Sequence, residues 1–220
     1  VMEWKGDGEW GTPAIALKRP YHLSYPFLFE WEGEHYLIPE SVANRRVELY
    51  RTSSFPIGWR LDRVLLDDID AVDPTVVRLD DRWWMFVTVR NPGRSPSTEL
   101  HVFHAETPLG PWSSHALNPV KLDIRSARPA GRPFEVDGSI YRPSQDCSVR
   151  YGGAIVLNRI EQLSETDYRE VVVDRIDPGW GPGLIGTHTI NSHHELTVVD
   201  GLARGARFER WARKKAARRR

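Results

Sequence analysis

The stretch SYPFLFEWEGEHYLIPES, residues 24–41, reads as two short strands joined by a tight turn. Aromatic and aliphatic residues alternate around the turn Glu32-Gly33-Glu34, which reads as a β-hairpin. Three related stretches follow: DPTVVRLDDRWWMFVTV (73–89), RPFEVDGSIYRPSQD (132–146) and, more loosely, THTINSHHELTVVDG (187–201). Their starts lie roughly 50 to 60 residues apart, the period expected of four-stranded propeller blades. The repeat predicts an all-β fold, a small β-propeller.

Further strand-like segments complete the predicted blades. RVELYR (46–51) and WRLDRVLL (59–66) follow the first hairpin, LHVFHA (100–105) and a strand near Trp112 follow the second, and AIVLNRI (154–160) and YREVVVDRI (168–176) follow the third. The fourth unit has only two strands. We therefore expect strands from both termini to close the last blade, with residues 2–17 as the missing partner. Adjacent Trp83 and Trp84 should point to opposite faces, one in the core and one outside.

The charge is distributed unevenly along the 220 residues. Residues 204–220 hold nine Lys or Arg against one Glu, whereas residues 1–203 hold 21 basic and 29 acidic side chains. We expect one propeller domain over 1–203 and a basic tail over 204–220, in which Phe208 and Trp211 favour a short amphipathic helix. The acidic body argues against a dedicated nucleic-acid-binding protein. The tail suits weak contact with an anionic surface.

Other sequence signals are few. Cys147 is the single cysteine, so no intrachain disulfide can form, and no segment approaches 18 consecutive apolar residues. A cytoplasmic location is expected, and the absence of a leader before the first strand-like residues suggests a fragment of a longer protein. Neither a Gly-rich phosphate loop nor a zinc-type Cys or His pattern occurs. No cofactor and no metal are expected.

At SYPFLFEWEGEHYLIPES, DPTVVRLDDRWWMF and YRPSQD the sequence resembles the propeller domain named for the N-terminal region of glucosamine inositolphosphorylceramide transferases. The likeness covers nearly everything from Tyr21 to Gly201. Similar domains occur in bacterial proteins, some joined to formyltransferase-like domains. That superfamily is in turn similar to the five-bladed propellers of glycoside hydrolase family 43. The resemblance implies five blades and a carbohydrate-related role, as a glycosidase-like enzyme or as part of a glycosyl or formyl transferase.

Family 43 enzymes use an aspartate base in the first blade, an aspartate that tunes acidity in a later one, and a glutamate acid in another. Asp73 matches the aspartate that precedes proline at the start of an inner strand. Tyr25 stands where the first-blade aspartate would precede proline, and no glutamate followed by Gly-Pro occurs at a strand start. The resemblance therefore carries over only one of the three catalytic groups.

Propeller blades point the starts of their inner strands at a shared axial pocket, so polar residues there are the catalytic candidates. Glycoside hydrolysis needs two carboxyls, about 5 to 5.5 Å apart for retention or roughly 6.5 to 9.5 Å for inversion. Glu40, Asp73 and Asp146 are the carboxylates best placed to face the axis, and His188 is a further acid or base. Each has a structural alternative: Glu40 bonds backbone of the next blade, Asp73 caps a turn, and His188 is simply hydrogen-bonded.

Four residues are candidates for substrate binding. Arg142 and Gln145 in YRPSQD are suited to clamp a carboxylate, a phosphate or sugar hydroxyls, although a buried Arg–Asp pair that fastens the third blade explains the same pattern. Asn191 accompanies His188 at the start of the fourth unit. Tyr25 either stacks on a sugar or packs in the core.

Three hypotheses follow. The chain is an enzyme domain acting on a glycan in an axial pocket, by hydrolysis or glycosyl transfer. Alternatively, it is a non-catalytic sugar or sugar-nucleotide binding module that serves a partner catalytic domain, which the missing base and acid favour. The third hypothesis is an interaction module whose basic tail contacts an anionic partner.

Overall fold

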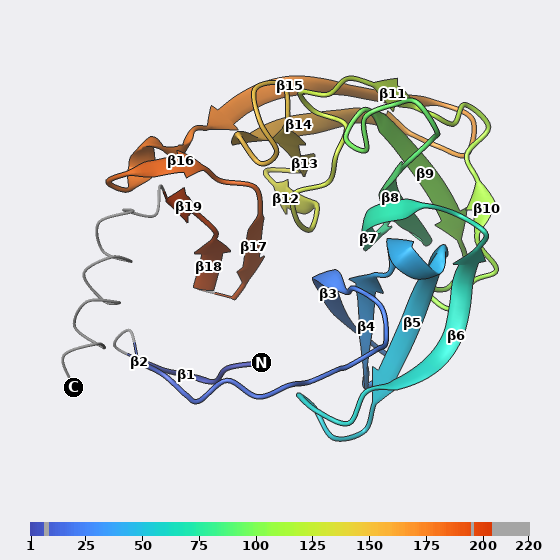
Figure 1. Ribbon diagram of the computed structural model, residues 1–220. Coiled ribbons are helices and arrows are strands. Elements are labelled where there is room, and N and C mark those ends of the chain that lie inside the picture. Colours follow the sequence, from blue (N-terminus) through green and yellow to red (C-terminus); the bar gives the residue numbers. More distant parts are fainter. Residues whose placement is uncertain (7–8, 195, 204–220) are drawn as a thin grey trace.

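The computed structural model describes residues 1–6, 9–194 and 196–203 and is built of β-strands with two short 3-10 turns, η1 (Val42–Asn44) and η2 (Pro178–Trp180). Three antiparallel sheets surround a common centre (Figure 1). The first blade contains β3 (Ser24–Trp31), β4 (Glu34–Glu40), β5 (Arg46–Thr52) and β6 (Arg60–Asp67). The second contains β7 (Ala71–Leu79), β8 (Arg82–Val89), β9 (Glu99–Ala105) and β10 (Ser113–Ser114), with β11 (Lys121–Leu122) also paired to β9. The third contains β12 (Phe134–Val136), β13 (Ser139–Asp146), β14 (Ala154–Leu163) and β15 (Tyr168–Ile176).

Each blade is a meander whose strands pair in sequence order. The innermost strands β3, β7 and β12 face the centre of the molecule, and β6 and β15 lie at its outer edge (Figure 1). The turns between the first two strands use Glu32, Asp80 and Asp137, all with φ near +50°. Such left-handed residues give tight turns that match the twist of the flanking strands. The predicted propeller blades are confirmed.

The remaining strands form two-stranded sheets. β16 (Leu184–Gly186) pairs with β19 (Leu202–Ala203), β17 (Ile190–His193) pairs with β18 (Leu196–Val199), and β1 (Trp4–Gly6) pairs with β2 (Glu9–Trp10). The sequence had suggested that residues 2–17 complete the last blade. Within the described ranges, β1 and β2 instead pair with each other. The helix expected over 204–220 lies outside the described residues. Across those same ranges, no helix has the length and apolar character needed to cross a membrane.

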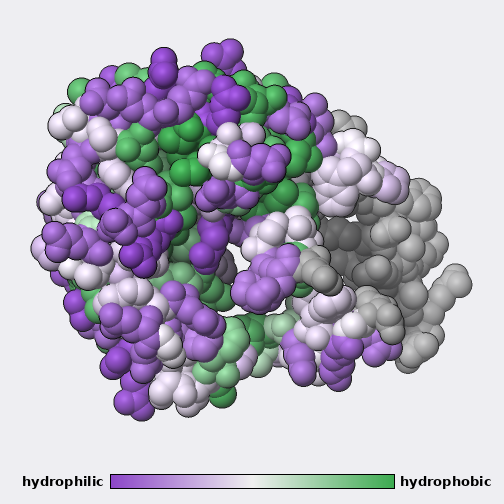
Figure 2. Space-filling view, turned by 180° about the vertical axis from the view of Figure 1, so that it is seen from behind, coloured by the Kyte–Doolittle hydropathy of each residue, from purple (hydrophilic) through white to green (hydrophobic). Residues whose placement is uncertain are grey.

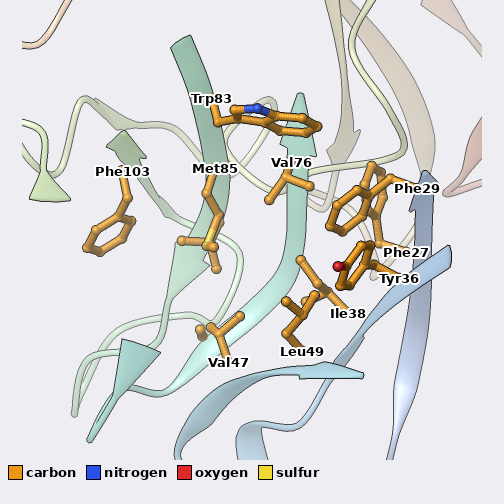
Figure 3. Packing of buried hydrophobic residues seen from close by; sticks show 12 residues of the cluster. Phe27, Phe29, Tyr36, Ile38, Val47, Leu49, Val76, Trp83, Met85 and Phe103 are labelled. Atoms are coloured by element: carbon orange, nitrogen blue, oxygen red, sulfur yellow. The ribbon is translucent and has the colours of Figure 1, made fainter. Parts of the chain in front are cut away.

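The main core lies between the first and second blades (Figure 3). Phe29 on β3 stacks on Tyr36 of β4, with ring centroids 5.3 Å apart, and lies 5.7 Å from Trp83 of β8. Met85 on the same strand is fully buried beside them. Because aromatic rings remove large apolar areas from water, this interface is a main source of cohesion between the blades.

The second blade is covered on both faces. Trp84, which points away from the first blade, packs in a second cluster with Phe86 and, from the third blade, Ile160 and Tyr168. Trp83 and Trp84 are both buried, so the expectation that one indole would lie outside is wrong. The reason is that a central blade packs against a neighbour on each side, whereas the hairpin pattern alone suggested one solvent-facing side.

Figure 2 shows the face opposite to that of Figure 1, hollowed near its centre. Hydrophilic residues cover much of the outer surface, and hydrophobic ones are visible deeper, between the blades. One side chain spans the centre of the molecule: Arg132, just before β12, donates a hydrogen bond to the carbonyl of Leu28 on β3, and its guanidinium carbon lies 4.9 Å from the ring centroid of Phe27. The third blade is thus tied to the first across the axis.

Candidate functional site

The site is built from three X-Pro dipeptides at the starts of the inner strands. Tyr25 and Asp73 both precede proline, have φ of 42° and 53°, and lie where the strand register shifts. Arg128 precedes Pro129, which bridges to Ser144 on β13. A bulge leaves a residue outside the ladder and re-aims its side chain. In the first two blades the bulge thus re-aims the residue before proline, and Arg128 of the third blade meets Asp73 through a direct hydrogen bond.

Asp73 is the centre of a buried polar cluster. Its Oδ2 accepts hydrogen bonds from Arg128 Nε at 2.6 Å and from Gln145 Nε2 at 3.0 Å. Its backbone N–H donates to Glu40 Oε2 at 3.1 Å, and Arg128 Nη2 lies 3.8 Å from that same oxygen. All four residues are at most 8% exposed. One arginine from the third blade is therefore placed between two carboxylates, one from each of the other two.

Burial governs the protonation of this cluster. Loss of hydration raises the pKa of Asp73 to about 7, with Arg128 opposing that rise and the nearby Glu40 charge adding to it. A carboxyl with such a pKa is partly protonated at neutral pH. Asp73 is therefore able to exchange a proton under physiological conditions, which an ordinary surface aspartate does not do.

Several hydroxyl groups lie around the Asp73 cluster. Ser24 Oγ donates to Glu40 Oε1 at 3.1 Å, and Ser97 Oγ accepts a hydrogen bond from Arg128 Nη1 at 3.5 Å. The hydroxyls of Tyr25 and Thr75 lie 2.9 Å apart within hydrogen-bonding distance. Burial raises the pKa of the Tyr25 phenol. Tyr25 thus lies at the axis, as predicted, with its hydroxyl bonded to the neighbouring blade.

Two aromatic side chains border the cluster. The guanidinium of Arg128 lies over the ring of Tyr151, 4.7 Å from its centroid, and the ring of His188 lies 5.3 Å from that centroid in an edge-on orientation. Tyr151 is 54% exposed, and about a third of the His188 side chain is exposed. These rings are the accessible part of the site.

Asp200 fixes His188. Its Oδ2 contacts His188 Nδ1, and its Oδ1 accepts the backbone N–H of His188 at 2.9 Å and of Thr189 at 2.7 Å. Burial by itself would raise the pKa of Asp200, but these hydrogen bonds outweigh it and lower the pKa to about 2. The carboxylate is therefore ionised and keeps Nδ1 of His188 as the protonated nitrogen.

Arg142 does not belong to the Asp73 cluster. Its side chain is fully buried and donates to both oxygens of Glu170 on β15, at 2.8 and 2.6 Å, and to the carbonyls of Ser126 and Ala127. Glu170 also binds Lys121 Nζ at 2.7 Å. Burial favours the neutral acid, but Arg142 outweighs it and lowers the pKa of Glu170 to about 2. This network fastens the third blade, with Glu170 rather than an aspartate as the partner of Arg142.

Asp146 and Asn191 also make structural contacts. Asp146 accepts a hydrogen bond from Arg175 at 2.5 Å and from the Ser148 N–H and hydroxyl at 2.9 and 2.6 Å, and these bonds lower its pKa although burial opposes them. It lines a small separate cavity with Arg150 and Arg175. Asn191 Oδ1 accepts the Arg132 N–H at 3.1 Å. Of the predicted residues, the structure brings together Glu40, Asp73, Gln145 and Tyr25, and places His188 at the border.

Arg128, Tyr151 and Asp200 were missed from the sequence. Arg128 had a signal, because an X-Pro dipeptide also opens the inner strands at Tyr25 and Asp73, seven residues before the turn residues Glu32 and Asp80. Arg128 lies nine residues before its turn, since the third blade has two additional residues there. Tyr151 and Asp200 lie in loops that carry no comparable pattern.

The comparison with protein families gives a clear result. The family described as "Glucosamine inositolphosphorylceramide transferase 1, N-terminal" matches residues 3–178. Glucosamine inositolphosphorylceramide transferase 1 of Oryza sativa subsp. japonica is 41% identical over 168 residues, which are 75% of this chain and 22% of that protein. The protein of the same name from Arabidopsis thaliana is 40% identical over 188 residues, 84% of this chain and 24% of that protein. The chain thus spans about a quarter of the length of these relatives.

Solved structures share the fold at low sequence identity. A thermostable family-43 glycoside hydrolase has a TM-score of 0.57 at 19% identity, covering 83% of this chain and 64% of that one. A family 117 glycoside hydrolase from the marine bacterium Zobellia galactanivorans has a TM-score of 0.58 at 14% identity, covering 80% and 54%. These likenesses support the propeller architecture. With the family match extending over residues 3–178, the chain belongs to the glucosamine inositolphosphorylceramide transferase 1 N-terminal family.

Proposed function

We propose that this propeller binds a carbohydrate at the end of its axis where Asp73, Arg128, Tyr151 and His188 lie, and serves a catalytic domain without itself breaking the glycosidic bond. This is the second of the three hypotheses drawn from the sequence. The observation that carries it is the position of Arg128 between Glu40 and Asp73.

Arg128 makes the two carboxylates unsuited to hydrolysis. A glycosidase holds a scissile bond between two carboxyls, one of which protonates the leaving group while the other attacks or activates water. Here the backbone N–H of Asp73 contacts the Glu40 carboxylate, and both side chains are buried with a shared cation. Such a cluster is instead a rigid set of polar groups. The charged and hydroxyl groups at its edge are available to a ligand.

The relatives support a carbohydrate ligand by their names, which describe transferases for glucosamine and inositolphosphorylceramide. A structural neighbour, exo-beta-1,3-galactanase from Phanerochaete chrysosporium, is described with beta-1,3-galactotriose. Because this chain corresponds to about a quarter of the named transferases, we assign the transfer reaction to other parts of such proteins. The propeller would supply sugar recognition.

One observation favours the enzymatic alternative. The pKa of Asp73 near 7 is the value expected of a general acid or base that works at neutral pH. Under this alternative Asp73 exchanges a proton with the substrate while Arg128 stabilises its anion. Hydrolysis would then need its second carboxyl from outside the described cluster.

A glycan array probed with the full chain tests the proposal, followed by affinity and turnover measurements on the glycans that bind. We expect glycan binding without cleavage or transfer. Arg128→Met should lose affinity at least about tenfold, because it removes a charged group and the hydrogen bonds that hold the cluster together. Asp67→Asn, a carboxylate removed from the outer strand β6, is the matched control and should bind normally. Turnover that disappears in Asp73→Asn would establish the enzymatic alternative instead.

Two sequence predictions about the surroundings of the protein stay predictions. One is the cytoplasmic location. The other is weak contact of residues 204–220 with anionic surfaces, for which binding to anionic vesicles at low salt before and after deletion of those residues is the test. Equal binding by both forms would contradict it.

A further inference from the structure

We infer that Tyr151 and His188 form a stacking subsite for a pyranose ring at the border of the axial cluster. The inference rests on the proposed carbohydrate binding and deepens it, because it names the groups that contact the sugar and the kind of surface that the sugar presents. Neither the sequence pattern nor the family comparison assigns Tyr151 or Asp200 a role.

The Tyr151 ring is held in position while keeping much of its surface free. Arg128 lies 4.7 Å from the ring centroid, and Arg128 is itself fixed by its 2.6 Å bond to Asp73. The residue Tyr151 is nevertheless 54% exposed. An exposed aromatic residue in a loop ordinarily samples several rotamers, so a cation held against it reduces the entropy lost when a ligand stacks there.

Two glycines hold His188 against the Tyr151 loop. A Cβ atom at Gly152 would lie 2.6 Å from His188 Cβ, and one at Gly186 would lie 2.5 Å from the carbonyl oxygen of Gly152. The Thr187 N–H also donates to that carbonyl at 3.0 Å. The loop that carries Tyr151 and the segment that carries His188 are therefore interlocked, and the two rings form one preformed surface.

His188 supplies the polar part of this surface. Asp200 contacts Nδ1, so Nε2 is the ring nitrogen that faces away from this partner. Within the part of the chain that the structure describes, no hydrogen bond reaches Nε2. A hydroxyl of a ligand has a suitable partner at this nitrogen.

This combination matches the chemistry of a sugar ring. A pyranose offers C–H groups on one face, which pack on an aromatic ring, and hydroxyls around its edge, which need hydrogen-bond partners. A purely apolar ligand would cover Nε2 of His188 without giving it a hydrogen-bond partner, which costs free energy. The pair therefore favours a glycan residue over a hydrocarbon chain.

The protein contains a matched control at another site. Phe55, 51% exposed, stacks on His35 with ring centroids 4.5 Å apart. Phe55 and His35 belong to the first blade and lie outside the Asp73 cluster. If every exposed aromatic–histidine pair bound sugars, removal of either the Phe55 ring or the Tyr151 ring would weaken glycan binding. Our inference assigns the effect to Tyr151 alone.

The experiment compares the wild type with Tyr151→Phe, Tyr151→Leu, His188→Ala and Phe55→Leu on the same glycan array, followed by titration of the strongest glycan. We expect Tyr151→Leu to lose affinity about tenfold and Tyr151→Phe to retain it, since the ring rather than the hydroxyl makes the contact. His188→Ala should lose a few-fold, with the loss depending on which hydroxyl of the glycan is blocked. Phe55→Leu should bind like the wild type.

The outcomes separate this inference from the proposed function. Glycan binding that is equal in the wild type and Tyr151→Leu would overturn the subsite and leave the carbohydrate proposal standing. Absence of binding to any glycan by the wild type would overturn both. Thermal unfolding of each variant distinguishes a lost contact from a lost fold, and equal losses in Tyr151→Phe and Tyr151→Leu would assign the effect to the phenol hydroxyl and contradict stacking.

Discussion

At the scale of single residues, position decides what an acidic group does. Asp73 lies on β7 and Asp146 ends β13, and both are buried; yet burial raises the pKa of Asp73 to about 7, whereas hydrogen bonds outweigh burial and lower that of Asp146. Both have arginine partners, Arg128 and Arg175. The difference is that Asp73 loses nearly all of its hydration, which penalises the charged form more than its partner stabilises it.

This shift predicts a pH dependence of stability. Asp73 has a native pKa near 7 and an unfolded one near 3.8, so its native state holds a proton that the unfolded chain releases between those values. Its contribution to the free energy of unfolding is full below pH 3.8 and is lost as the pH rises through 7. Asp73→Asn stays neutral, so the wild type should lose more than about 1 kcal/mol relative to the variant between pH 4 and 8.

Urea titrations of both proteins at a series of pH values measure this difference. Asp67→Asn, which removes an exposed carboxylate, controls for the general change in charge. A constant difference between wild type and Asp73→Asn across the range would mean that Asp73 is ionised throughout, with Arg128 dominating over burial.

At the scale of elements, the segment just before β12, which contains Gly131 and Arg132, contacts two other parts of the molecule. Arg132 reaches Leu28 on β3, while its N–H binds Asn191 on β17. The Ile190 N–H donates to the carbonyl of Ala130 at 2.8 Å. This segment therefore contacts the first blade and the β17–β18 hairpin at once, across the centre of the molecule.

Gly131 is required for that contact. Its φ is 137°, and a Cβ there would lie 1.8 Å from the carbonyl oxygen of Ile190. We expect Gly131→Ala to lower the free energy of unfolding by at least about 2 kcal/mol, because backbone must shift and a strained φ is imposed. Gly179→Ala, where no atom lies within 4 Å of the added methyl, should change it by less than about 0.5 kcal/mol. Similar midpoints for both variants in chemical denaturation would contradict a tightly packed axial segment.

At the scale of the whole molecule, cohesion comes from faces shared between blades. Strand-to-strand ladders hold each blade together, and among the described strands none of these ladders joins one blade to the next. The cluster of Phe29, Tyr36, Trp83 and Met85 joins the first blade to the second, and the cluster around Trp84 and Phe86 joins the second to the third. The polar residues at the axis depend on these contacts, since Glu40, Asp73 and Arg128 come from different blades.

This arrangement predicts that neighbouring blades lose stability together. Phe29→Ala should cost about 3 to 5 kcal/mol, because it removes a buried ring and leaves a cavity against Trp83. Hydrogen exchange should then accelerate in β8 of the second blade as well as in β3 and β4. Leu61→Ala, at a residue 48% exposed on β6, should leave exchange nearly unchanged. Faster exchange confined to the first blade would show that the blades open independently.

Much of the fold was readable from the sequence. The hairpin at 24–41 and its later counterparts have period-two alternation and turn residues that dictate a strand–turn–strand unit, because successive side chains on a strand must face opposite sides. The recurrence of that unit predicted the blades. Asp73 was singled out at an X-Pro start, and Glu40 and Gln145 at the ends of predicted strands; the structure places the three side chains in one cluster. The pattern did not show that both faces of the second blade are buried, so one of the two indoles of Trp83 and Trp84 was expected to lie outside.

The sequence by itself determined where the strands lie and which residues begin them, since these depend on local alternation, turns and proline. Only the tertiary structure decided which charges pair. Arg142, expected to face the ligand or to bind an aspartate, binds Glu170, and Arg128, which the sequence did not single out, binds Asp73. Partners of this kind lie 28 and 55 residues apart, and blade packing rather than local pattern fixes which side chains meet. The same packing desolvates Asp73, which raises its pKa and makes it chemically distinct from the other acids of the chain.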